Sequence, residues 1–398
     1  MTQPSLISHF ASGAAVLWNG AARLRVGLYQ NGLLRRGRLS AKVISIGNIA
    51  WGGTGKTPFT LWLARRLQSG GPSRALASDG GVRVSILTRG YRRSSRDRVR
   101  IIPSGTPPED AADAGDEVQL YLRNLRMPIG ISASRTEAGR LLESQFPVDV
   151  HLLDDGFQHL ALHRDLDLVL VDAENPWGRR GAFPSLLRES PAALRRADAI
   201  LLTRCELLPS AANEDSLENL RATIQRLNPS APCFTVRTQL LNFREWRGNH
   251  ALAPEEFRSR RPLAFCALGN PRAFFLTLEK FAVPVVGQKA LPQKAFPQKA
   301  FPDHHRYSRN DVGSLEKAAA EAGCDCLVTT EKDIFNLPPG ANFRLPLYWA
   351  AIESRVDEEA RLLQWIWDRL KLPGAPPAHQ PEAAGNPQAQ FATESTSR

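Results

Sequence analysis

Acidic residues are missing from the first part of the chain: no aspartate or glutamate precedes Asp79, whereas six basic residues crowd positions 23–42. The whole chain of 398 residues carries a formal net charge of +11. This imbalance favours an acidic partner, such as a nucleic acid, an anionic lipid or a phosphorylated substrate. Because the sequence has no recognition motif and no interleaving of aromatic with basic residues, we expect no binding to nucleic acid.

Cysteine pairs and long apolar runs are also missing. The five cysteines form no CxxC motif and are odd in number, which argues against a disulfide framework or a zinc site and for a reducing compartment. The uncharged run at positions 10–22 contains two glycines, a serine and an asparagine, so it is too short and too polar to predict a membrane span. The N-terminus shows neither the basic segment nor the cleavage signal of a secretory leader.

An apolar face nevertheless recurs at three- and four-residue steps across positions 5–34, which predicts an amphipathic helix. Basic residues on and after this helix suit a position on an anionic membrane surface. The alternative is that the helix packs on the protein's own core. The residues of the apolar face are Ile7, Phe10, Ala14, Leu17, Trp18, Ala21, Leu24 and Leu28.

The stretch VISIGNIAWGGTGKTPFT at positions 43–60 has the order of a phosphate-binding loop: a β-branched strand, a glycine-rich turn, a Gly-Lys-Thr triplet and an apolar helical pattern. Glycines let backbone N–H groups approach phosphate oxygens, and the helix start adds unpaired donors. Lys56 is then placed to reach the β- and γ-phosphates of a nucleotide, and Thr57 to bind Mg²⁺. The predicted nucleotide-binding residues are Gly52, Gly53, Thr54, Gly55, Lys56 and Thr57.

The usual spacing of this motif asks for a glycine at the place where the chain has Ala50. The additional glycines and the order of strand, loop and helix compensate for this departure. An ordinary glycine-rich turn is the alternative interpretation, but such a turn has no need for a lysine followed by a threonine at this point.

A second buried strand, at positions 148–153, ends in Asp154 and Asp155. A carboxylate at the end of such a strand completes the Mg²⁺ site in phosphate-loop enzymes. Two adjacent carboxylates in an apolar context are costly unless a cation is present. We therefore predict a metal site formed by Thr57, Asp154 and Asp155. His159, a few residues further on, is interpreted as a structural histidine.

Other polar residues follow predicted strands or open predicted helices. A basic turn with Arg89 comes after the strand at positions 84–87, at the edge where open α/β sheets bind ligands; a solvated loop is the alternative. Asp116 opens a helix, where acids also serve simply as partners of the helix dipole. A basic loop at positions 178–189 either contacts a phosphorylated substrate or is merely exposed.

Strands that alternate with helical patterns predict a mostly parallel, doubly wound sheet of the P-loop NTPase-like α/β class, followed by a smaller α/β domain. The smaller domain ends in a predicted helix at positions 350–372. The tandem repeat QKAxP at positions 288–302 has a proline in every unit, so it is interpreted as a duplication within a loop. The predicted divisions are an N-terminal amphipathic membrane-associated helix (1–40), the phosphate-loop core domain (41–241), the smaller domain (242–372) and a disordered tail (373–398).

Seven motifs occur in the order and rough spacing of one family: GNIAWGGTGKTP, LTRGYRR, GDE, DDGFQH, LRE, FPDHHRY and TTEKD. Together they make the chain resemble the tetraacyldisaccharide 4'-kinases, the lipid A 4'-kinases of Gram-negative bacteria. The resemblance covers most of the chain and implies an enzyme that uses ATP and Mg²⁺. It implies transfer of the γ-phosphoryl group to the 4'-hydroxyl of an acylated disaccharide 1-phosphate, which forms lipid IVA.

The resemblance also implies a peripheral protein at the cytoplasmic face of the bacterial inner membrane, with its active site between two domains; we expect a monomer. In the family's pattern Lys56 holds phosphates, and Asp116 is the base that deprotonates the sugar hydroxyl. Its partner is a histidine, because a histidine can orient a carboxylate and share its proton. That partner is His304 or His305, with His305 preferred. The implied substrate contacts are Arg89, Tyr91, Gln158 and Arg188.

A second hypothesis is a phosphate-loop ATPase or GTPase that switches a membrane-associated protein partner. Such a switch would hydrolyse nucleotide without any sugar acceptor and would dimerise with nucleotide. The combination of Asp116 with a histidine pair favours the kinase, because it suits the deprotonation of an acceptor hydroxyl.

Overall fold

A computed structural model of the chain describes residues 20, 24–70, 81–90, 97–178, 187–208, 213–248, 250–282 and 296–372. Of the predicted N-terminal helix it describes position 20 and a helical segment at 24–30. Tyr91, the start of the QKAxP repeat and the predicted tail lie outside the described residues. Within these ranges no helix has both the length and the apolar character needed to cross a membrane.

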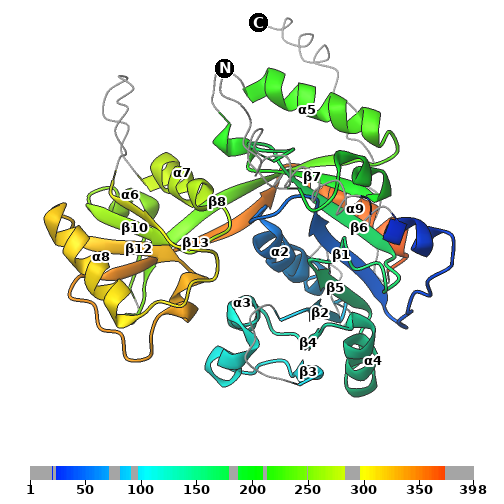
Figure 1. Cartoon of the computed structure of the whole chain (residues 1–398), viewed down its shortest axis with the longest axis horizontal. Helices are drawn as coiled ribbons and strands as arrows, with labels where there is room; N and C mark the ends of the chain where they lie inside the picture. The colour runs from blue at the N-terminus through cyan, green and yellow to red at the C-terminus, as the bar shows by residue number, and fades with distance from the viewer. Residues whose placement is uncertain are drawn as a thin grey trace, which may run out of the picture.

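The strands of the described chain join one sheet, which runs through the whole molecule (Figure 1). They are β1 Lys42–Asn48, β2 Val84–Thr88, β3 Val99–Ile102, β4 Ile129–Ser132, β5 Val150–Asp154, β6 Leu166–Asp172, β7 Ala199–Thr203, β8 Cys233–Glu245, β9 Ala251–Leu252, β10 Pro262–Cys266, β11 Gln298–Ala300, β12 Cys326–Thr330 and β13 Leu347–Val356. Their order in the sheet is β11-β10-β12-β13-β8-β7-β6-β1-β5-β2-β4-β3, with β9 paired to β8.

The helices flank this sheet on both faces. They are α2 Lys56–Gln68, α3 Asp116–Asn124, α4 Arg135–Gln145, α5 Asn213–Leu227, α6 Pro254–Phe257, α7 Pro271–Ala282, α8 Arg309–Glu321 and α9 Glu359–Leu370. Short 3₁₀ helices include η2 Pro108–Ala114, η3 Pro191–Arg196, η4 Cys205–Leu207 and η6 Asp333–Asn336.

Strands β1, β2 and β4 to β7 form the first lobe, in which every neighbouring pair is parallel. Strand β1 is buried over almost its whole length, as expected for a parallel strand covered by helices on both faces. Helices α2, α3 and α9 supply the core on one face, and α4 and α5 supply it on the other. The lobe is therefore doubly wound, as the sequence predicts.

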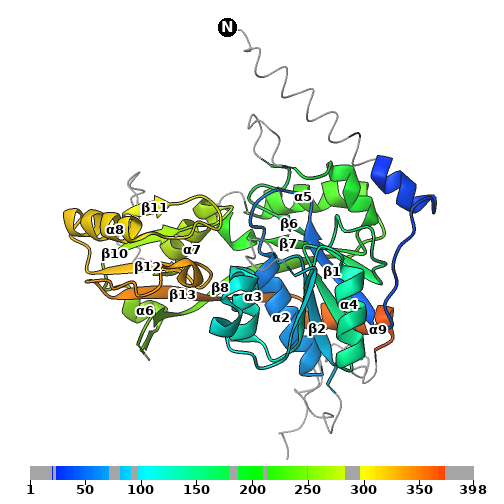
Figure 2. The same ribbon diagram turned by 60° about the horizontal axis from the view of Figure 1, so that its bottom comes forward.

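The second lobe is built from β10, β11 and β12, with α6 and α7 on one face and α8 on the other. It lies beside the first lobe along the same sheet (Figure 2). The prediction that the QKAxP repeat lies within a loop is wrong for its last unit. Positions 298–300 form β11, which pairs in parallel with β10 at the sheet edge. The FPDHHRY motif therefore begins directly after an edge strand.

A long antiparallel ribbon of β8 and β13 connects the two lobes. The first half of β8 pairs with β7 in the first lobe, and the first half of β13 pairs with β12 in the second. The predicted helix at 350–372 is consequently wrong at its start, since positions 350–356 belong to β13. Pairing with β8 outweighs the weak local preference of this segment.

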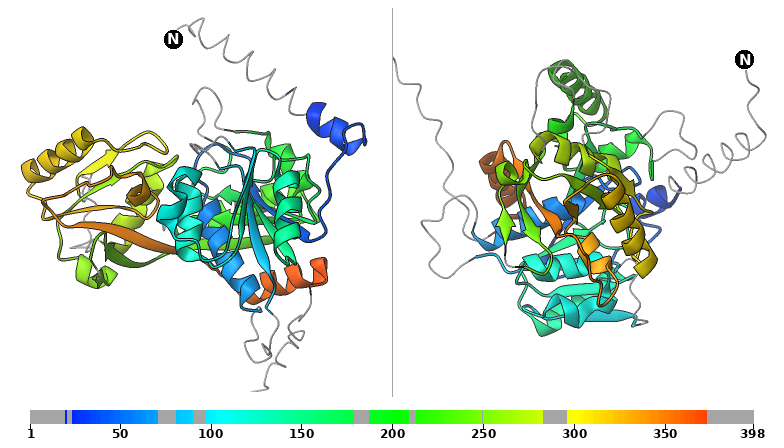
Figure 3. Two further views of the ribbon diagram at one scale, coloured as in Figure 1. Left: turned by 90° about the horizontal axis from the view of Figure 1, so that it is seen from below. Right: turned by 90° about the vertical axis from the view of Figure 1, so that its left-hand side faces the viewer.

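After β13 the chain returns to the first lobe, as the orange strand and the following helix show in Figure 3. Leu362, Ile366 and Trp367 of α9 are buried in the same core as α2 and β1. The helix that sequence analysis assigned to the smaller domain thus packs on the phosphate-loop lobe.

Candidate active site

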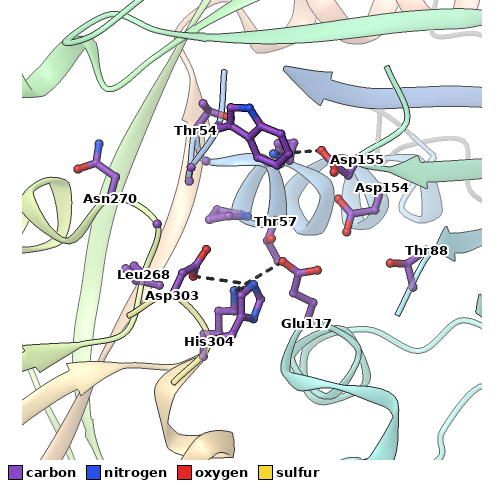
Figure 4. Close-up of a pocket in the computed structure, with 18 of the residues that line it drawn as sticks. Thr54, Thr57, Thr88, Glu117, Asp154, Asp155, Leu268, Asn270, Asp303 and His304 are labelled. Atoms are coloured by element: carbon purple, nitrogen blue, oxygen red, sulfur yellow. Dashed lines mark hydrogen bonds and ion pairs between the residues drawn. The ribbon is translucent and has the colours of Figure 1, made fainter. Parts of the chain in front are cut away.

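A cavity of about 1250 Å³ lies between the two lobes. The glycine-rich turn before α2, the ends of β2 and β5 and the start of α3 line it from the first lobe. Residues after β10 and β12 line it from the second, and Figure 4 shows the side chains that face it. The carboxyl ends of parallel strands therefore meet at the cavity, as they do at ligand sites of open α/β sheets.

The glycine-rich turn is held in shape by its own residues. Gly52 and Gly55 have φ angles of 98° and 87°, a left-handed backbone that glycine adopts without strain. The side-chain N–H of Asn48 donates to the hydroxyl oxygen of Thr54 at 3.0 Å, and its side-chain carbonyl accepts from Lys56 Nζ at 3.1 Å. All six predicted nucleotide-binding residues line the cavity.

Asp155 forms ion pairs with two cations beside this turn: Lys56 at 3.2 Å and Arg188 at 2.6 Å. Burial raises the pKa of Asp155, but the charges of Lys56 and Arg188 outweigh burial and hold the pKa at about 2. The Arg188 guanidinium also lies 4.8 Å from the centre of the Trp51 ring. Arg188, a predicted substrate contact, and Asp155, a predicted metal ligand, therefore neutralise each other in this structure.

Asp154 ends β5 and is only 3% exposed. Burial, together with the negative charges of Glu117 and Asp155, raises the pKa of Asp154 to about 7. A carboxylate in this position is stabilised by a nearby cation. Thr57 and Asp154 offer a hydroxyl and a carboxylate oxygen around the same part of the cavity (Figure 4), and these are ligand types that Mg²⁺ prefers.

The residues near Asp154 therefore fit a magnesium ion. In the part of the chain that the structure describes, no three histidine, cysteine, aspartate or glutamate side chains gather closely enough to hold a metal unaided. Mg²⁺ commonly binds through one or two carboxylates and completes its coordination with water and substrate phosphates. A site formed by Thr57, Asp154 and a nucleotide agrees with this coordination preference of Mg²⁺.

Asp116, the first residue of α3, meets His304 from the second lobe. His304 Nδ1 lies 2.8 Å from Asp116 Oδ2. The preference for His305 as the partner is wrong, because His305 contacts Asp311 at 3.1 Å and stacks on Phe301. His304 has a left-handed backbone with φ of 56°, so its side chain points in a different direction from that of His305.

Two residues that sequence analysis did not single out complete the pair. Asn336 donates to Asp116 Oδ2 at 3.0 Å, and Lys332 Nζ lies 3.2 Å from His304 Nε2. Burial lowers the pKa of Lys332, but the charges of Glu117 and Asp116 outweigh burial and raise it, so the amine is a charged donor. The available signal was the motif TTEKD, which contains Lys332.

The lysine fixes the protonation of the histidine. Because Lys332 can only donate, His304 Nε2 must accept, and the ring proton sits on Nδ1, where it is donated to Asp116. Burial raises the pKa of Asp116, but the hydrogen bond from His304 and the charge of Lys332 outweigh burial and hold it at about 2. In the resting pair Asp116 is therefore ionised and accepts the Nδ1–H of His304.

A basic group lines another part of the cavity and consists of Arg25, Arg89, Arg135 and His159. Arg135 is 6% exposed, and its Nε has no hydrogen-bond partner among the described residues. Burial lowers the pKa of Arg135 to about 10, and burial with the surrounding arginines lowers that of His159 to about 3. Arg135 is thus a buried cation for which the described residues supply no ion pair with a carboxylate, and such a donor favours an anionic ligand. Sequence analysis missed Arg135 and interpreted His159 as structural.

Two of the predicted substrate contacts lie at the cavity besides Arg188. Gln158 donates to the backbone oxygen of Asn48 at 2.8 Å and to the carboxylate of Glu189 at 3.0 Å. Arg89 lines the cavity with an exposed side chain. Tyr91 is outside the described residues.

A phosphate loop alone fits switches and kinases alike, and the Asp116–His304 pair decides between them, because nucleotide hydrolysis needs no base for an acceptor hydroxyl. The fold and the site together define the chain as a P-loop kinase. Comparison with known proteins identifies the kind of kinase. The sequence model described as Tetraacyldisaccharide-1-P 4'-kinase matches residues 9–371, and the chain belongs to this family.

Known relatives agree with this assignment. A tetraacyldisaccharide 4'-kinase from Syntrophobacter fumaroxidans is 39% identical over 306 residues, which cover 76% of this chain and 74% of the relative. One from Anaeromyxobacter dehalogenans (strain 2CP-C) is 39% identical over 329 residues, with 81% and 79% covered. The crystal structure of LpxK from Aquifex aeolicus in complex with ATP has a TM-score of 0.62 and 24% identity, covering 92% of this chain and 100% of that one. The predicted family, fold class and kinase activity are confirmed.

Proposed function

We propose that the protein transfers the γ-phosphoryl group of ATP to the 4'-hydroxyl of a tetraacyldisaccharide 1-phosphate and so forms lipid IVA. The observation that carries this proposal is the Asp116–His304 pair, which joins the two lobes at the cavity of the phosphate loop. An acid–base pair beside a phosphate loop serves an acceptor hydroxyl rather than a water-driven switch. The names of the relatives supply the identity of the acceptor.

On the donor side, the phosphates of ATP lie on the glycine-rich turn at the start of α2. Lys56 exchanges its contact with Asp155 for the β- and γ-phosphates, while Arg188 continues to neutralise Asp155. Thr57 and Asp154 would hold Mg²⁺, which would neutralise negative charge on the nucleotide phosphates. The remaining work of the protein is positioning, as in phosphoryl transfer generally.

On the acceptor side, the Asp116–His304 pair takes the proton of the attacking hydroxyl. Both residues are buried, but His304 lines the cavity, whereas Asp116 is not among the lining residues and holds the histidine from behind. When the acceptor binds, Lys332 gives up its contact with His304 Nε2, so that Nε2 takes the hydroxyl proton. The new P–O bond then forms at the acceptor oxygen while the bond between the γ-phosphorus and ADP breaks, and ADP leaves. Lys332 keeps its charge throughout and stabilises the anionic side of the reaction.

The basic group of Arg25, Arg89 and Arg135 binds the 1-phosphate of the acceptor in this proposal. Arginine donors match phosphate oxygens in geometry and charge, and Arg135 has a buried Nε that needs an acceptor. The distance between this group and the phosphate loop then selects an acceptor with phosphate at one end and a free hydroxyl at the other.

The proposed function is tested by incubating purified protein with ATP labelled in the γ-phosphate, Mg²⁺ and the acylated disaccharide 1-phosphate. We expect the label to move to the lipid, and ATP to stay intact when lipid is omitted. A lipid already phosphorylated at the 4'-position is the matched control and should take no label. Hydrolysis of ATP that ignores the lipid would place the protein in the switch class instead.

The adjacent histidines give a matched test of the site. His304→Ala is expected to lower kcat by about 10²-fold or more, because the attacking hydroxyl of the lipid then lacks the histidine that takes its proton. His305→Ala should leave kcat near the wild-type value, since its partner Asp311 lies at the start of α8 rather than at the cavity. Steady-state kinetics with the lipid acceptor measures both. Equal losses in the two variants would refute the assignment of His304.

We also propose that the protein works at the cytoplasmic face of the inner membrane, held there by its N-terminal segment. Leu24 and Leu33 are 66% and 71% exposed, close to the basic residues at positions 23–42. Deleting residues 1–34 should weaken binding to anionic vesicles, measured by cosedimentation, and leave ATP affinity unchanged. Equal partitioning of the truncated and full-length proteins would contradict this prediction.

A further inference from the structure

The phosphate loop touches the second lobe directly, backbone against backbone. Gly269 follows β10, and a Cβ built on it would lie 2.9 Å from the Cα of Gly52 and 3.0 Å from the backbone N of Gly53. The backbone of Gly269 is not left-handed, so the demand for glycine comes from space and not from conformation. Figure 4 shows its neighbours Leu268 and Asn270 at the cavity.

The segment around Gly269 is joined by backbone hydrogen bonds to the segment that carries His304. The N–H of His304 donates to the carbonyl of Ala267 at 3.1 Å, and the N–H of Phe301 donates to the carbonyl of Cys266 at 2.9 Å. A shift of the chain at Gly269 therefore carries His304 with it. The imagined Cβ would also lie 3.1 Å from the Asp303 carboxylate, next to His304 in the chain.

The position of His304 matters because its partner Asp116 belongs to the other lobe. Their contact of 2.8 Å exists only at one separation of the lobes. The seam near Gly269 is reinforced by an ion pair of 3.0 Å between Arg272, at the start of α7, and Glu174, in the turn after β6. The contact between the phosphate loop and the second lobe thus sets the position of His304 relative to Asp116.

We propose that Gly269 is a positioning residue: it lets the second lobe rest directly on the phosphate loop and so sets the separation at which His304 meets Asp116. This inference rests on the proposed kinase function. A side chain at position 269 would act as a spacer between the lobes. Each lobe would still fold and ATP would still bind, but His304 would be displaced from Asp116.

The test is the variant Gly269→Ala in the full chain, with Gly313→Ala as the matched control. Gly313 lies in α8 of the same lobe, and a Cβ there meets no atom within 4 Å. A displacement of about 1 Å can cost about 10²-fold in rate, so kcat should fall by about 10- to 10²-fold in Gly269→Ala and stay unchanged in the control. ATP affinity, measured by equilibrium binding without lipid, should be the same in both.

A merely structural effect is separated by repeating the substitution in the background of His304→Ala. If Gly269 acts through His304, the second substitution should cost no further rate, because the contact that it displaces is already gone. A loss of full size in that background would overturn the proposal, and so would wild-type kcat in the single variant. If instead the wild-type protein transfers no label to the lipid, it is the proposed function that fails.

A second variant covers the case in which Gly269→Ala folds poorly. Arg272 is 63% exposed in its side chain, so Arg272→Ala loosens the same seam without disturbing a core. Because the ion pair is open to solvent and contributes little, this variant should lower kcat for lipid phosphorylation by only a few-fold, far less than Gly269→Ala, through the position of the pair at the seam. ATP affinity should be unchanged. Wild-type kcat in this variant would count against the role of the seam.

Discussion

Replacement of Asp116 by asparagine is expected to lower kcat for lipid phosphorylation by about 10²–10⁴-fold. The substitution keeps the size of the side chain and can still accept a hydrogen bond from His304, but it removes the negative charge that stabilises the proton taken from the acceptor. ATP affinity should be unchanged, since Asp116 belongs to α3 and makes no contact with the glycine-rich turn among the described residues. Rapid-quench measurement of one turnover checks the chemical step itself.

The chain offers a matched control for this variant, because it contains a second aspartate–histidine pair. Asp311 contacts His305 at 3.1 Å and also caps α8 through Ser308. Asp311→Asn should lower stability, because a helix cap is weakened, while kcat stays near wild type. If Asp311→Asn and Asp116→Asn lose the same activity, the loss reports stability, and the role of Asp116 as part of the base is wrong.

Replacement of Lys56 by alanine is expected to lower kcat by about 10²–10³-fold or more, since the variant loses the cation that meets the β- and γ-phosphates. The surrounding structure should survive, because Asp155 keeps its ion pair with Arg188. Lys56→Arg should not restore the rate: the wide guanidinium does not replace a compact ammonium beside Asn48. Transfer of labelled phosphate and equilibrium binding of ATP measure the two consequences separately.

Lys42 provides the control on the same strand. It begins β1, at the opposite end from the phosphate loop, and forms a partly exposed ion pair with Asp165 at 3.3 Å. Lys42→Ala should leave both kcat and ATP affinity unchanged, because exposed ion pairs contribute little. A comparable loss in Lys42→Ala would show that any damage to β1 disables the enzyme. The loss in Lys56→Ala would then be no evidence for a specific role of Lys56 in phosphate binding.

The parts of the site that sequence analysis located are those whose meaning is local. A phosphate loop is a run of consecutive residues with one physical purpose, so Gly52 to Thr57 could be found without a fold. The placement of Asp154 follows from a buried strand that ends in a carboxylate. For the same reason the predicted strands at 84–87 and 148–153, which are short apolar runs between turns, lie close to the observed β2 and β5.

The parts that escaped sequence analysis depend on residues far apart in the chain. Which of two adjacent histidines faces Asp116 depends on the left-handed backbone at His304, and no residue type encodes that angle. Lys332 and Asn336 acquire their role only when the second lobe brings them to α3. The segment 350–356 becomes a strand because it pairs with β8, so its sequence pattern alone gave the wrong prediction of a helix.

The return of α9 to the first lobe has a consequence for how the protein is made. Synthesis proceeds from the N-terminus, so the second lobe can assemble as soon as β13 has left the ribosome. The lobe that begins first must wait longer, because Leu362, Ile366 and Trp367 cover one side of its core. The nascent chain therefore carries an uncovered apolar surface beside α2 until α9 emerges. We therefore expect the second lobe to complete its core before the first, and a premature stop before Glu359 to damage the phosphate-loop lobe.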